Sequence, residues 1–134
     1  MTEIQAVGLY AGVNILLMLF LAANVVRHRR RSSISLGIGT DADLEQAVRA
    51  QANCLENAVP GLLALTLLAL TGASSLILHG FGVALTFGRL AHAHGLLSQP
   101  GRSFGRFYGT LITWVSLLGM AVLLVLTPFI PALQ

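Results

Sequence analysis

The chain has no lysine, a single cysteine and few acidic residues, and each shortage narrows what it can be. Its eight basic side chains are all arginine, and five acidic residues leave a formal net charge of +3 over 134 residues. Charged residues make up 10% of the chain, whereas a soluble domain has about 25%. The one cysteine, Cys54, excludes a disulfide within the chain. These shortages argue against a soluble domain.

Hydrophobic residues make up 55% of the chain and gather in long runs. A helix needs about 20 apolar residues to cross the hydrocarbon core of a bilayer. Runs of that length occur at about residues 4–26, 44–71, 76–97 and 105–130. Because no long polar segment separates them, residues 1–134 are expected to form one domain. The sequence predicts an all-α membrane protein, a four-transmembrane-helix bundle whose first partner is the lipid bilayer.

Arginine indicates how these spans are oriented. The run Arg27–Arg31 follows the first span directly, and Arg102 and Arg106 lie between the third and fourth. Arginine is enriched in cytoplasmic connections, so both connections are expected there and both termini on the other side. The positive charge follows the first apolar run, which fits an anchor better than a cleaved signal peptide. Since the arginines lie at span ends or inside spans, no nucleic acid partner is expected.

The second span carries an unusual polar face. Arg49, Asn53 and Glu56 are spaced i, i+4 and i+7, which places them on one side of a helix. An ionisable group in a spanning segment costs about 2.5 to 3.5 kcal/mol, so such groups usually face a polar cavity or one another. Helix rise places Glu56 about 10 Å deep and Arg89 of the third span about 12 Å deep. We therefore expect Arg89 to pair with Glu56, within one subunit or across two.

That pair has two interpretations. A structural ion pair would fix the register of the helices. Alternatively, the pair belongs to a site with excess positive charge, because the arginines at this level outnumber Glu56. The planar guanidinium suits a carboxylate, and Glu56 could hold an ammonium group. This pattern favours a zwitterionic ligand with more than one carboxylate. The arginines concerned are Arg49, Arg89, Arg102 and Arg106.

The segment Arg49–Pro60 resembles the second-helix signature of the MAPEG family, the membrane-associated proteins in eicosanoid and glutathione metabolism. The similarity continues in Gly88–His92, Pro100–Ser103 and Arg106–Gly109. It implies a homotrimer that binds glutathione at subunit interfaces near the cytoplasmic face. The compact chain is most similar to short bacterial members, which implies the inner membrane.

The resemblance also implies roles for individual residues. Arg102 or Arg106 would stabilise the glutathione thiolate, because an adjacent cation lowers the pKa of a thiol. Ser103 would either donate a hydrogen bond to the same sulfur or cap the fourth span, because serine is common at a helix start. His92 and His94 point about 200° apart on a helix, and no metal site is expected. The residues implied to bind glutathione are Arg49, Gln51, Asn53, Glu56, Arg89, His92, Ser103 and Tyr108.

Three functions follow from these patterns. The first is a glutathione-dependent membrane transferase or peroxidase, with glutathione as co-substrate and a hydrophobic electrophile or lipid hydroperoxide as the second substrate. The second is a catalytically inactive scaffold or ligand-binding protein of the same fold. The third is a small four-span exporter of cations built around Glu56, which the surrounding arginines disfavour because they repel cations. The tyrosines that the family's eicosanoid enzymes carry near the end of the third helix are absent from 91–97, so eicosanoid specificity is not expected.

Overall fold

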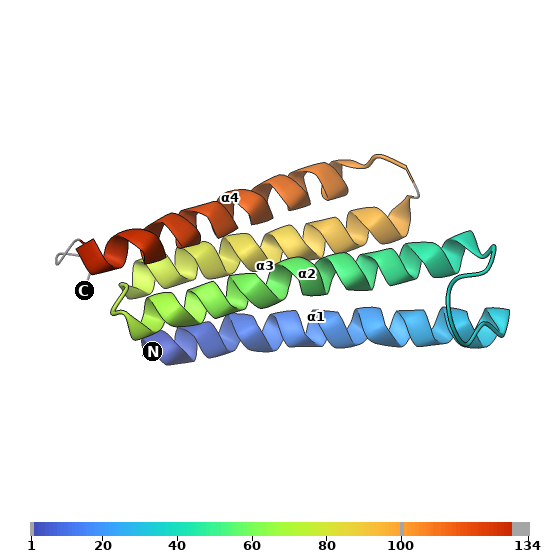
Figure 1. Ribbon diagram of the computed structural model, residues 1–134, viewed down its shortest axis with the longest axis horizontal. Coiled ribbons are helices and arrows are strands. Elements are labelled where there is room, and N and C mark those ends of the chain that lie inside the picture. The colour runs from blue at the N-terminus through green and yellow to red at the C-terminus, as the bar shows by residue number, and fades with distance from the viewer. Residues whose placement is uncertain (1, 100, 130–134) are drawn as a thin grey trace.

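Four long helices run through the computed structural model, which describes residues 2–99 and 101–129 (Figure 1). Each helix is long and apolar enough to cross a membrane. The predicted all-α, four-span membrane fold is confirmed. The elements are α1 (Glu3–Ser32), α2 (Ala42–Leu70), α3 (Ser75–Ser98) and α4 (Phe104–Leu126), followed by the short 3-10 helix η1 (Thr127–Phe129).

Helix α1 is longer than its apolar run predicts. It continues beyond residue 26 through the arginines to Ser32. Its 30 residues span about 45 Å, more than the hydrocarbon core of about 30 Å. Basic side chains in the last turn favour this extension because they face the negative end of the helix dipole. One of them, Arg29, donates a hydrogen bond of 2.9 Å to the carbonyl oxygen of Gly37 and so holds the following loop.

Helix α2 begins at a carboxylate cap. The sequence indicates one, because Thr40 to Asp43, with Glu45 close behind, supply the oxygen acceptors and negative charge that a helix N-terminus favours. The side chain of Asp41 accepts a hydrogen bond of 2.9 Å from the backbone N–H of Leu44. This hydrogen bond holds the pKa of Asp41 below its ordinary value of 3.8. Because the folded state favours the ionised form, the cap stabilises the helix above pH 3.8 and is lost on further acidification.

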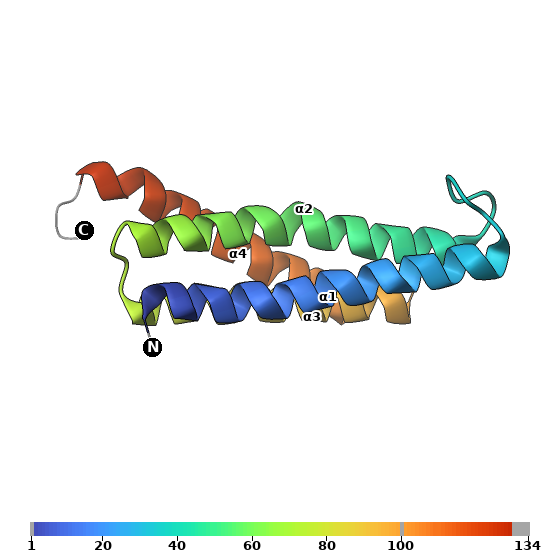
Figure 2. The ribbon, with the colours of Figure 1, turned by 90° about the horizontal axis from the view of Figure 1, so that it is seen from below.

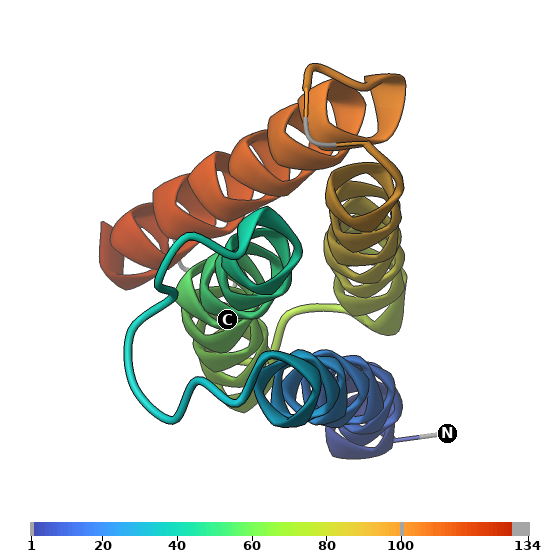
Figure 3. The same ribbon diagram turned by 90° about the vertical axis from the view of Figure 1, so that its right-hand side faces the viewer.

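The helices pack in an unequal way. Helices α1, α2 and α3 run side by side, whereas α4 crosses them obliquely, as Figure 2 and the end-on view of Figure 3 show. The α1–α2 loop and the α3–α4 turn lie at one end of the bundle, opposite the N-terminus (Figure 1). This end carries the arginines that the charge pattern predicts to be cytoplasmic.

Glycine allows α3 and α4 to approach closely. A Cβ atom added to Gly109 would lie 2.5 Å from the backbone nitrogen of His92 and 2.7 Å from the carbonyl oxygen of Gly88. Such distances leave no room for a side chain, so the two helices pack backbone against backbone. Gly8 and Gly12, like Gly80, Ala84 and Gly88, and like Gly105 and Gly109, follow one another at four-residue spacing. Among the described residues, however, no atom of another element approaches the Cβ positions of Gly8, Gly12 and Gly80 within 4 Å. Spacing alone did not distinguish the two groups.

The crossing of α3 and α4 generates a stability prediction. Gly109→Ala should lower the free energy of unfolding by about 1 to 3 kcal/mol, because the added methyl group meets backbone atoms that cannot move aside. Gly80→Ala is the control, since its methyl group meets open space and alanine favours a helix. Denaturation in micelles, followed by helical circular dichroism, measures both variants. Equal stability of the two variants would contradict the packing described.

Candidate functional site

A buried guanidinium joins three of the helices. The side chain of Arg89, on α3, is only 1% exposed. Its Nε donates a hydrogen bond of 2.9 Å to Oγ1 of Thr113 on α4, and its Nη1 donates one of 2.8 Å to Oδ1 of Asn53 on α2. Its Nη2 donates to the carbonyl oxygen of Gly109 at 3.3 Å. We call Arg89, Asn53, Thr113 and Gly109 the arginine clamp.

The pairing of Arg89 with Glu56 does not form within the chain. Among the described residues, the hydrogen bonds of Arg89 reach only neutral acceptors, and the side chain of Glu56 is exposed. Asn53, one turn before Glu56 on α2, accepts from the guanidinium instead. Depth alone could not show that neutral groups would supply every acceptor. Thr113 was not predicted as a site residue for the same reason. Its position four residues after Gly109, which places it on the same face of α4, could have indicated it.

A polar cavity lies next to the arginine clamp, among α2, α3 and α4. Its volume is about 320 Å³. It brings together four residues predicted for the site, namely Arg49, Asn53, His92 and Arg106. Ala42, Glu45, Gln46 and Leu96 complete its lining. The side chain of Gln46 donates a hydrogen bond to the carbonyl oxygen of Leu96 and so ties α2 to α3 here. We call this space the polar pocket.

A larger apolar groove adjoins the polar pocket. It has a volume of about 600 Å³, and His92 and Arg106 line both spaces. Arg102 and Ser103 border the groove at its polar end. The remaining lining side chains are Phe107, Thr110, Leu111 and Trp114 of α4. A polar ligand in the pocket would therefore lie beside an apolar molecule in the groove.

Ser103 caps α4, one of the two readings that the sequence allowed. Its Oγ accepts a hydrogen bond of 3.3 Å from the backbone N–H of Arg106. The same hydroxyl donates its proton to the carbonyl oxygen of Gly95 at 2.9 Å. Arg106 is held in turn by a hydrogen bond of 2.6 Å from its Nη1 to the carbonyl oxygen of Gly101. These contacts fix the first turn of α4 against the end of α3.

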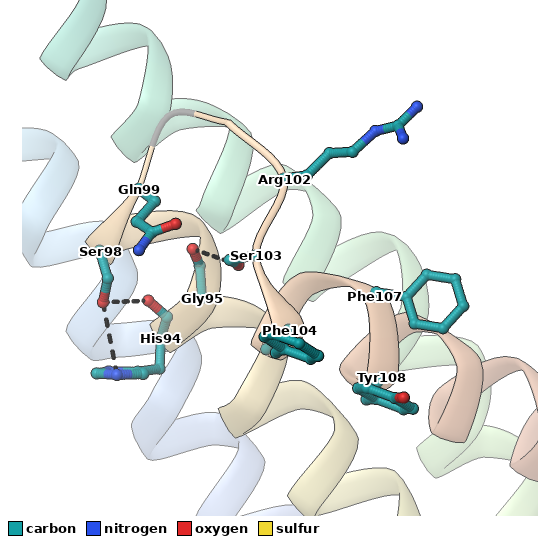
Figure 4. Close-up of a pocket in the computed structure, with 10 residues that line it drawn as sticks. His94, Gly95, Ser98, Gln99, Arg102, Ser103, Phe104, Phe107 and Tyr108 are labelled. Atoms are coloured by element: carbon teal, nitrogen blue, oxygen red, sulfur yellow. Dashed lines mark hydrogen bonds between the residues drawn. The ribbon is translucent and has the colours of Figure 1, made fainter.

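Some predicted site residues lie elsewhere. Gln51 and Glu56 line neither the polar pocket nor the apolar groove, and Glu56 is exposed on the surface of the chain. Tyr108 lies on another side of α4, stacked with Phe104 (Figure 4). Arg102 is exposed, and its side chain extends away from the end of α3 (Figure 4). Of the eight residues implied to bind glutathione, four line the polar pocket or the groove, namely Arg49, Asn53, His92 and Ser103. Arg89 lies in the clamp, and Gln51, Glu56 and Tyr108 line neither space.

The fold and the site define a four-span integral membrane protein with an arginine-lined pocket at one end of the bundle. Comparison with known proteins identifies it further. The model of the MAPEG family matches residues 7–126, and the chain belongs to this family. The chain is 30% identical to the inner membrane protein YecN of Escherichia coli K12 over 115 residues. The aligned segment covers 86% of this chain and 86% of YecN. YecN of Escherichia coli O6:H1 gives the same values. The chain is thus an inner membrane protein of the MAPEG family.

The arginine clamp generates a second prediction. Thr113→Val keeps the shape of the side chain but removes the acceptor of Arg89 Nε, leaving a buried charged donor unsatisfied. The free energy of unfolding should fall by about 1 to 3 kcal/mol. Thr66→Val is the control, because the Thr66 hydroxyl only donates to the carbonyl oxygen of Leu62 in its own helix. Thermal denaturation in detergent compares them. If both variants melt alike, Thr113 does not stabilise the buried guanidinium.

Proposed function

We propose that the chain is a glutathione-dependent membrane transferase or peroxidase, which acts on hydrophobic electrophiles or lipid hydroperoxides. One observation carries this proposal. Arg49 of α2 and Arg106 of α4 meet beside His92 in a pocket of about 320 Å³, and that pocket adjoins an apolar groove of about 600 Å³. Both volumes lie in the range of small-molecule sites, about 300 to 1,000 Å³.

The groups that line the polar pocket fit glutathione. Glutathione carries two carboxylates, an ammonium group and a thiol. Arg49 and Arg106 supply two guanidinium groups for the carboxylates, although Nη1 of Arg106 already donates to the carbonyl oxygen of Gly101. Glu45 at the edge of the same pocket supplies a carboxylate for the ammonium group. The arginine clamp uses the side-chain oxygen of Asn53, so Asn53 positions Arg89 and is left with its amide N–H groups for a ligand.

A homotrimer would complete this site. Glu56 is an exposed carboxylate in a helix that crosses the membrane. Leaving it against lipid is costly, whereas a second copy of the chain would cover it with protein. Gln51 and Glu56 would then reach glutathione from the subunit interface. In this arrangement the surface of α2 that carries them is the trimer contact.

The chemistry requires a thiolate. A thiol with a pKa near 8.5 is mostly protonated at about pH 7, and a fixed cation beside it stabilises the ionised form. Arg102 and Arg106 both border the groove. The thiolate would attack an electrophilic carbon, forming a C–S bond while a halide leaves with the bonding electrons. With a hydroperoxide, the sulfur takes the terminal oxygen, and the alkoxide that leaves takes up a proton.

Glutathione affinity tests the pocket. We expect calorimetric titration of the detergent-purified protein to show binding, and Arg49→Ala to weaken it about tenfold or more through loss of charged hydrogen bonds. Arg31→Ala removes an exposed arginine outside the pocket and should bind as the wild type does. Absence of binding heat and of thermal stabilisation at millimolar glutathione would refute the site assignment.

Thiolate formation tests the chemistry. The ultraviolet absorbance of the thiolate should rise when glutathione binds, and the rise should vanish in Arg102→Ala or in Arg106→Ala, because one of these cations faces the sulfur. Turnover of an aryl halide or a lipid hydroperoxide should be lost in the same variant. Survival of the absorbance in both variants would exclude the proposed activation. Normal binding without turnover in the wild type would instead indicate a ligand-binding protein.

A further inference from the structure

A third space lies at the α3–α4 turn; it shares Arg102, Ser103 and Phe107 with the apolar groove but no lining residue with the polar pocket. Its volume is about 660 Å³, and Figure 4 shows its lining side chains. All of them come from the end of α3, the turn and the start of α4, and none comes from α2. They are His94, Gly95, Ser98, Gln99, Arg102, Ser103, Phe104, Gly105, Phe107 and Tyr108. We call this space the turn cavity.

Aromatic rings form one wall of the turn cavity. Phe104 and Tyr108 are stacked with their centroids 6.1 Å apart and their planes 3° from parallel. Phe107 meets Tyr108 edge to face at 5.2 Å. All three rings are exposed, Phe104 by 83%. They lie in the first two turns of α4, where a spanning helix enters the bilayer and where aromatic side chains commonly contact lipid.

The other lining groups are polar, and one of them, Arg102, is cationic. Arg102 is exposed in the turn, and its side chain lies above Phe107 (Figure 4). His94 and Ser98 occupy successive turns of α3, where the Ser98 hydroxyl donates a hydrogen bond of 2.7 Å to the His94 carbonyl oxygen. Within the described part of the chain, no acidic side chain lines the cavity. The opening therefore favours an anion.

The floor of the turn cavity is held in place. The hydrogen bond from Ser103 to the carbonyl oxygen of Gly95 crosses from the turn to α3. A Cβ atom on Gly95 would lie 2.6 Å from the backbone nitrogen of Arg106, so backbone packs directly beneath the cavity. A cavity with a fixed floor retains its shape when a flexible ligand enters, which lowers the entropic cost of binding.

We propose that the turn cavity binds an anionic phospholipid. Its phosphate interacts with Arg102, and an acyl chain lies over the rings of Phe104 and Tyr108. The charge at the opening favours a lipid with a net negative charge over a zwitterionic one. The exposed aromatic wall favours a ligand with an apolar tail over a soluble phosphate. The lipid site shares Arg102 with the groove of the proposed function, but its test measures lipid affinity and does not depend on glutathione binding.

Lipid binding to the delipidated, detergent-purified protein tests this proposal. Native mass spectrometry measures affinity for phosphatidylglycerol and for phosphatidylcholine, and thermal shift measures the effect of free glycerol phosphate. We expect phosphatidylglycerol to bind most tightly, and Arg102→Gln to weaken it about fivefold. Arg30→Gln removes the same charge from the end of α1, outside the cavity, and should have a much smaller effect.

The aromatic wall is tested in the same way. Phe104→Ala combined with Tyr108→Ala should weaken phosphatidylglycerol binding, whereas Phe87→Ala, which removes an exposed ring of α3, should not. Unchanged helical circular dichroism shows that each variant is folded. The proposal is wrong if Arg30→Gln weakens binding as much as Arg102→Gln, or if phosphatidylcholine binds equally well. Stabilisation by glycerol phosphate equal to that by the lipid would also overturn it.

Discussion

The packing of the helices depends on the hydrogen bonds that the buried guanidinium of Arg89 donates. A guanidinium in the middle of an apolar bundle must have its donors paired, because water is absent and an unpaired charged donor is costly. Arg89 meets this requirement with acceptors on α2 and α4. Gly109 serves twice, since its carbonyl oxygen accepts from Arg89 and its missing side chain permits the close helix crossing. The clamp therefore sets the distances among three helices.

Because the clamp uses neutral acceptors, it consumes no carboxylate. Glu56 is left exposed on α2, and Arg49 and Arg106 line a pocket beside the clamp. The excess positive charge that the sequence predicted is thus located at one end of the bundle. A ligand with two carboxylates complements it, and membership of the MAPEG family makes glutathione the natural proposal. In the proposed function, the adjoining apolar groove would hold a hydrophobic second substrate beside the thiol.

Much of this could be predicted from the sequence. The four spans, the α2 cap at Asp41 and the family follow from hydrophobic length, cap chemistry and one motif. The partners of Arg89 could not be predicted, because depth along two helices does not fix their rotation or separation. The α3–α4 approach depends on which glycines face a neighbouring helix, and spacing alone does not separate Gly109 from Gly80. Helix α1 also continues beyond its apolar run, because the basic side chains of its last turn favour the helix end and hydrophobic length does not reveal this.

The central claim is that two arginines from different helices make a pocket for paired carboxylates. It is tested most directly by comparing glutathione with an ester in which one carboxylate is masked, by calorimetry on wild type and on Arg49→Ala. We expect the wild type to bind one monoester about tenfold more weakly than glutathione, and Arg49→Ala to bind the two almost equally. Equal affinity of the wild type for glutathione and for every ester would contradict the claim.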